Sequence, residues 1–96
     1  MAKLSLYHYD TCFYCRRVRS TIDELGLEVE LRDVRKDPTH RAALTEARGR
    51  RTVPVLRIEE DGTERWMPES ADIIRYLNQL AGQEPKRKPG FLGFFG

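Results

Sequence analysis

The stretch Cys12-Phe13-Tyr14-Cys15 stands where the spacing of apolar residues changes from that of a strand to that of a helix. Residues 4–9 alternate with a period close to two, which indicates a β-strand. Beyond the second cysteine, the apolar residues share one helical face, and Gly26 then favours a left-handed helix end. We therefore expect both cysteines at the N-terminus of the first helix.

The remaining elements follow from the same kind of pattern. A second strand is predicted from Leu27 to about Asp33, and with the first strand and helix it forms a βαβ unit with parallel strands. Asp37-Pro38 predicts the start of a second helix that ends at Gly49. Asp61-Gly62 predicts a hairpin between two further strands, and Ser70 is predicted to cap a last helix ending at Gly82. The expected fold is α/β, with a four-stranded mixed sheet, flanking helices and the order βαβαββα.

Composition restricts the class of protein. The 96 residues are 40% hydrophobic and 33% charged, as expected for one folded domain rather than a disordered chain. No apolar run approaches the roughly 20 residues that cross a bilayer, so no transmembrane segment is expected. The net charge of +2 arises after residue 82, from three basic residues against Glu84, and this argues against a nucleic-acid partner.

The domain is expected to span residues 1–82, followed by a basic and aromatic tail over residues 83–96. The first residues alternate like a strand and lack the apolar stretch of an export signal, so we expect a cytoplasmic location. We also expect a monomer.

Cysteine chemistry depends on the placement of the two thiols. Free N–H groups and the helix dipole favour the thiolate form of Cys12, the expected nucleophile, and Cys15 lies one turn later as the expected resolving thiol. Two unrelated buried thiols are the alternative. Zinc would need two further ligands, and only the isolated His8 and His40 are available, so no metal site is expected. His8 is expected to be half-buried in a strand, and His40 solvated.

The chain resembles glutaredoxin, a member of the thioredoxin superfamily, over residues 3 to about 81. The likeness rests on Cys12-Phe13-Tyr14-Cys15-Arg16-Arg17, on Gly49-Arg50-Arg51-Thr52-Val53-Pro54 and on the order of elements. It implies a thioredoxin-like fold with a cis proline at Pro54 facing the active-site cysteine. It also implies a glutathione site formed by the following residues: Tyr14, Arg51, Thr52, Val53 and Pro54. Two positions differ from the family pattern, because Phe13 replaces a proline and Tyr9 replaces a lysine.

Glu69-Ser70 resembles a different family, the glutathione transferase N-terminal domain, where such a pair holds the γ-glutamyl group. Ser70 and free helix N–H groups can receive a carboxylate, while Glu69 can receive an ammonium group. A routine helix cap is the alternative. A complete transferase is not expected, because the sequence given stops where a helical second domain would begin.

Taken together, these features predict a glutathione-dependent thiol–disulfide oxidoreductase with a redox-active disulfide between Cys12 and Cys15. The resemblance implies glutathione as co-substrate and glutathionylated or disulfide-bonded proteins as partners. One alternative is a carrier in which two chains hold a [2Fe–2S] cluster through Cys12 and two glutathiones. Another alternative is a dedicated electron donor to one reductase.

Overall fold

Four strands and three helices follow one another along residues 2–50 and 52–82, the part of the chain that the computed structural model describes. Their order is the predicted βαβαββα. The elements have these bounds: β1 Lys3–His8, α1 Phe13–Leu25, β2 Glu30–Asp33, α2 Pro38–Arg48, β3 Val55–Glu60, β4 Thr63–Met67 and α3 Ser70–Gly82. The tail predicted over residues 83–96 lies outside the described residues, as does Arg51.

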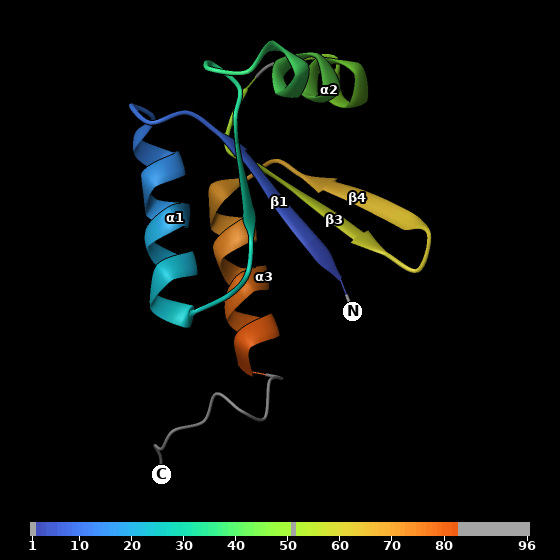
Figure 1. The fold of residues 1–96 in the computed structure, drawn as a ribbon. Helices are drawn as coiled ribbons and strands as arrows, with labels where there is room; N and C mark the ends of the chain where they lie inside the picture. Colours follow the sequence, from blue (N-terminus) through green and yellow to red (C-terminus); the bar gives the residue numbers. More distant parts are fainter. Residues whose placement is uncertain (1, 51, 83–96) are drawn as a thin grey trace, which may run out of the picture.

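The sheet has the strand order β2-β1-β3-β4 and is mixed, as the sequence predicts (Figure 1). β1 runs parallel to β2 and antiparallel to β3, and β3 runs antiparallel to β4. The register places Leu6 opposite Leu56 and Tyr7 opposite Val55. Consequently the end of β1 and the beginning of β3 lie at the same edge of the sheet.

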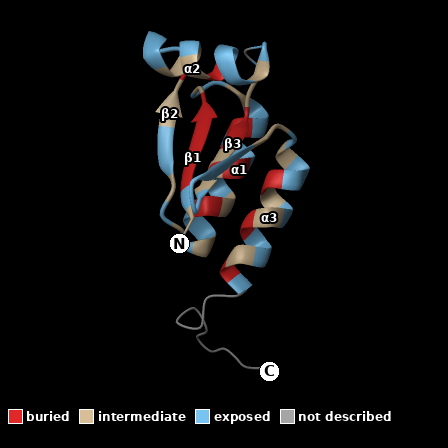
Figure 2. Cartoon of the chain, turned by 90° about the vertical axis from the view of Figure 1, so that its right-hand side faces the viewer, coloured by how far each residue is buried: buried red, intermediate tan, exposed pale blue. Residues whose placement is uncertain are grey.

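Helices cover both faces of this sheet. α1 and α3 pack on one face, where the buried cluster consists of Leu4, Leu6, Val18, Ile22, Leu56, Ile58, Ile73 and Leu77. On the other face Leu44 of α2 packs with Tyr7, Val34 and Val55. Figure 2 shows that buried residues are concentrated on β1, because this strand has neighbours on both sides and a helix layer on each face.

The turns form where the sequence predicts them. α1 ends at Gly26, whose φ of 66° is left-handed, and the Asp37 side chain accepts a hydrogen bond from the Thr39 N–H at the start of α2. Asp61 and Gly62 both have positive φ, 54° and 80°, as a two-residue hairpin turn between twisted strands requires.

Three details differ from the predictions. β2 begins at Glu30 rather than Leu27, and Leu31 is 49% exposed, because β2 is an edge strand that the helices leave partly uncovered. Ser70 is the first residue of α3 and not its cap, because the carbonyl of Glu69 already accepts the helical hydrogen bond from the Ile73 N–H. His8 is buried rather than half-buried, since it ends the central strand.

One buried and one exposed leucine should differ in what the same substitution costs in stability. Leu77→Ala should lower the free energy of unfolding by about 2–5 kcal/mol, because it leaves a cavity between α3 and the sheet. Leu31→Ala, the matched control at an exposed leucine, should change it by about 0.5 kcal/mol or less. Urea denaturation followed by circular dichroism measures both, and equal losses would contradict this arrangement of the core.

Candidate functional site

Cys12 occupies the N-cap of α1. The chain leaves β1 at His8 and turns, so that the Cys12 N–H donates to the carbonyl of Tyr9 at 3.2 Å. The carbonyl of Cys12 then accepts the first helical hydrogen bond, which comes from the Arg16 N–H. The Sγ of Cys12 accepts a hydrogen bond from the Cys15 N–H at 3.3 Å. The sulfur therefore takes the place of a capping oxygen, and it accepts from one of the otherwise free N–H groups of the first helical turn.

Cys15 lies one helical turn later and is completely buried. Burial raises the pKa of its thiol to about 12, and a side-chain hydrogen bond with Cys12 contributes in the same direction. Cys15 is thus a protonated thiol at neutral pH, whereas Cys12 is only partly buried and reachable from solvent. The two thiols are neighbours that differ in their access to solvent.

The loop before β3 lies next to Cys12, at the end of the sheet where β1 ends and β3 begins. The peptide bond between Val53 and Pro54 is cis, and the Sγ of Cys12 lies 4.0 Å from the carbonyl oxygen of Val53. Pro54 is buried and leads into β3, a central strand, so it is not the first residue of an edge strand. Thr52 is exposed and Val53 is half-buried. Cys12, Val53 and Pro54 are therefore brought together.

Two aromatic side chains stand out from the surface beside Cys12. Phe13 is 64% exposed and Tyr14 is 55% exposed, and their rings meet edge to face at a centroid distance of 5.4 Å. Apolar rings that remain in water at a helix start provide contact area for a ligand or partner bound next to the sulfur.

The predicted pair Glu69 and Ser70 lies at the start of α3. α1 and α3 run side by side with their N-termini at the same end of the molecule (Figure 1), and they bury Val18 and Ile22 against Ile73 and Leu77. Glu69 is exposed and Ser70 is half-buried. The pair and Cys12 therefore lie at the same end of the helix layer.

The arginines before the proline loop are only partly described. Arg50 is exposed and Arg48 is half-buried at the end of α2. The predicted contribution of Arg51 to a ligand site falls on a residue outside the described ranges.

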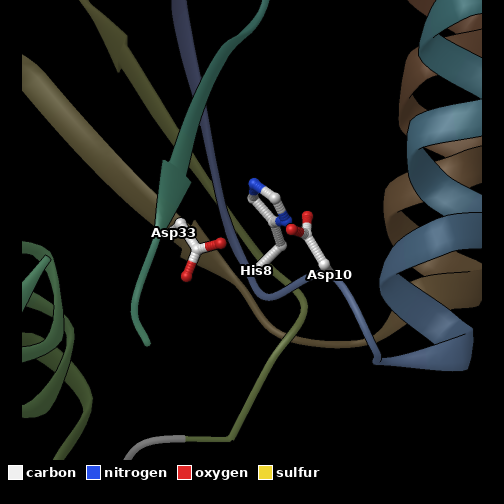
Figure 3. Close-up of side chains that lie close together, drawn as sticks. All are labelled: His8, Asp10 and Asp33. Atoms are coloured by element: carbon white, nitrogen blue, oxygen red, sulfur yellow. The ribbon is translucent and has the colours of Figure 1, made fainter. Parts of the chain in front are cut away.

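A second group of polar side chains lies at the end of β1, where the loop to Cys12 begins. His8, Asp10 and Asp33 have ligand-type atoms that are all within 4.8 Å of one another (Figure 3). Burial, with the charge of Arg19, lowers the pKa of His8, so its imidazole is neutral at neutral pH. The group was missed in the sequence because Asp33 is 25 positions from His8, and only the strand register brings them together.

Residues 6–85 match the family model of the glutathione S-transferase N-terminal domain. The chain belongs to this family. The resemblance to glutaredoxin and to this domain, noted from the cysteine motif and from Glu69-Ser70, is thereby confirmed at the level of the family.

Among curated proteins, the domain is similar to glutaredoxin 2 of Escherichia coli strain K12, with 34% identity over 80 residues. The alignment covers 83% of this chain and 35% of the relative. The chain thus spans about a third of the length of the curated relatives it matches.

Two solved structures show the same fold. Maleylacetoacetate isomerase from Anaeromyxobacter dehalogenans, with bound dicarboxyethyl glutathione and citrate, is 30% identical, with a TM-score of 0.66, covering 85% of this chain and 38% of the isomerase. A thioredoxin-like protein is 24% identical with a TM-score of 0.62, covering 81% of this chain and 97% of that protein. The predicted thioredoxin-like fold is therefore confirmed. In the described part of the chain, no helix has the length and apolar character needed to span a bilayer.

The unequal environments of the thiols predict selective alkylation. Iodoacetamide at pH 8 should add one group, at Cys12, because Cys15 is buried and its thiol is held protonated by a pKa of about 12. Peptide mass spectrometry locates the adduct, and the same reaction in denaturant should give two adducts as the control. Modification of Cys15 first would show that the assigned environments are reversed.

Proposed function

We propose that the domain is a glutathione-dependent thiol–disulfide oxidoreductase in which Cys12 is the nucleophile. The proposal depends on one observation above all: the Sγ of Cys12 caps α1 and faces the Val53 carbonyl beside a cis proline. A hydrogen bond from a backbone N–H to this sulfur strengthens as the sulfur gains negative charge, so the site favours attack by Cys12. The similarity to glutaredoxin 2 of E. coli supports the same chemistry.

The reaction on a glutathionylated protein takes place in two exchanges. The Cys12 thiolate attacks the glutathione sulfur, the S–S bond to the protein breaks, and the protein leaves as a thiol after taking up a proton. A second glutathione thiolate then attacks the sulfur held on Cys12, which releases glutathione disulfide and restores Cys12. One added glutathione is thus consumed for each mixed disulfide, and the products are the protein thiol and one glutathione disulfide, which contains the glutathione that the protein carried.

Cys15 is needed for a different substrate. When Cys12 is joined to a protein that had an internal disulfide, the Cys15 thiol can lose its proton and attack the Cys12 sulfur. The client is released with both thiols reduced, and a Cys12–Cys15 disulfide remains for two glutathiones to reduce. The high pKa of Cys15 makes this step depend on transient deprotonation at a buried position.

Glutathione recognition is proposed to use the edge of the sheet and the start of α3. The exposed carboxylate of Glu69 can receive the γ-glutamyl ammonium, and Ser70 with the N–H groups of α3 can receive the α-carboxylate. The half-buried backbone of Val53 can pair with the cysteinyl unit of glutathione as an added strand. Tyr14 and Thr52 are exposed, and they are proposed to contribute to the same site together with Pro54 and Arg51.

A second candidate is a glutathione addition or isomerisation activity. The observation in its favour is the 30% identity to the isomerase, whose structure holds dicarboxyethyl glutathione. In that chemistry the thiol of bound glutathione reacts with a carbon electrophile, and no exchange between Cys12 and Cys15 takes place. Loss of disulfide reduction on replacing Cys12 is therefore expected for the oxidoreductase, whereas the addition or isomerisation activity involves no disulfide exchange at Cys12.

Substitution of each cysteine should separate their roles. Cys12→Ser should lower the rate of reduction of a glutathione mixed disulfide by more than about a hundredfold, because a serine hydroxyl is not a comparable nucleophile. Cys15→Ala should retain this activity and lose most of its activity toward an internal protein disulfide. The rate of glutathione disulfide formation, coupled to glutathione reductase, measures both. An active Cys12→Ser variant, or an inactive Cys15→Ala variant with the mixed disulfide, would contradict these assignments.

The proposed γ-glutamyl contacts can be tested separately from the chemistry. Glu69→Gln should weaken glutathione binding about tenfold, because a charge-assisted hydrogen bond to an ammonium group is lost. Ser70→Ala should weaken it less, and Glu46→Gln on α2 is the matched control with no expected effect. Isothermal titration calorimetry gives the affinities, and alkylation of Cys12 should proceed at the same rate in all variants. Equal affinities would remove Glu69 from the site.

A further inference from the structure

His8 ends β1 as a buried imidazole with no partner for either ring nitrogen. Its exposed fraction is 3%, and among the described residues neither Nδ1 nor Nε2 has a hydrogen-bond partner. Buried polar groups are normally paired, so such an imidazole requires an explanation. The proposed oxidoreductase reaction uses no group at this position.

Two carboxylates converge on this imidazole. The parallel register of β1 and β2 places Asp33 directly opposite His8, and Asp10 follows two residues later in the loop. Figure 3 shows the ring of His8 between the strand that carries Asp33 and the loop that carries Asp10. One ligand atom from each of the three residues lies within 4.8 Å of the others.

The two carboxylates accept hydrogen bonds from groups other than His8. Oδ1 of Asp33 accepts hydrogen bonds from the N–H groups of Arg35 and Lys36, which leaves Oδ2 available. Asp10 forms ion pairs with Arg19 at 3.4 Å and with Lys36 at 3.2 Å, and it lies on the surface. Neither carboxylate therefore satisfies the imidazole.

We propose that His8, Asp10 and Asp33 form a three-ligand site for a first-row divalent cation such as zinc. A neutral imidazole nitrogen and two carboxylate oxygens are ligands that zinc accepts, and water can complete a tetrahedral shell. The site is independent of the proposed oxidoreductase function, because it uses neither cysteine.

Two positively charged side chains next to the site lower its affinity for a divalent cation. Arg19 and Lys36 both form ion pairs with Asp10, so a bound divalent ion must share Asp10 with them or displace them. Removing one of these positive charges should tighten metal binding. A purely structural role for the cluster gives no reason for such an effect.

Zinc affinity should be measured by competition with a chromophoric chelator in a Cys12→Ser parent, where the accessible thiol is absent. One zinc should bind per chain, and the imidazole NMR signals of His8 should shift while those of His40 stay in place. His8→Leu should weaken binding by more than about tenfold, and His40→Gln, which removes the only other histidine, should not change it. No binding by the parent, or a zinc shift confined to His40, would overturn the site.

Lys36→Gln provides a test that does not depend on the folding of a core variant, because Lys36 is exposed. It should tighten zinc binding several-fold, whereas Lys3→Gln, at the far end of β1 beside Glu30, should leave it unchanged. Unchanged affinity in Lys36→Gln together with full affinity in His8→Leu would place the zinc elsewhere and refute the proposal.

Discussion

The antiparallel pairing of β1 with β3 brings the two halves of the candidate site together. Tyr7 lies opposite Val55, so the turn that follows β1 and the loop that precedes β3 meet at one edge of the sheet. This register is fixed by burial, because a shift of one residue would turn Leu4 and Leu6 away from the helices they contact. Cys12 and Pro54 are therefore positioned by the core, although neither belongs to a strand.

The different chemistry of the two cysteines follows from their separation of three residues on a helix. Cys12 caps α1, where its sulfur accepts a hydrogen bond from the Cys15 N–H, and the Cys15 side chain is buried in the first turn. Burial raises the pKa of Cys15 to about 12, so its thiol is protonated at neutral pH. The same helix thus presents one accessible thiol, the proposed nucleophile, and one buried thiol.

Local patterns in the sequence predicted the elements well, because periodicity, caps and turn residues act within a few positions. Asp37, Gly26 and Asp61-Gly62 each have the conformation that their residue types favour. Tertiary burial was less predictable, because Leu31 fits the alternating pattern but lies on an edge strand that the helices leave partly uncovered. The exact start of the last helix also differs from the prediction, since the Glu69 carbonyl accepts the first helical hydrogen bond and Ser70 is already helical. The cluster of His8 with Asp33 depends on strand register, which no local pattern specifies.

The most direct measurement is the structure of the mixed disulfide formed when a Cys15→Ala variant reacts with glutathione disulfide. Mass spectrometry should show one glutathione, attached to Cys12, since no resolving thiol remains to release it. Intermolecular NMR contacts should place its cysteinyl unit along Val53 and its γ-glutamyl unit beside Glu69 and Ser70. Failure to form the adduct at Cys12, or glutathione held away from the Val53 loop, would contradict a glutathione-dependent site at this edge of the sheet.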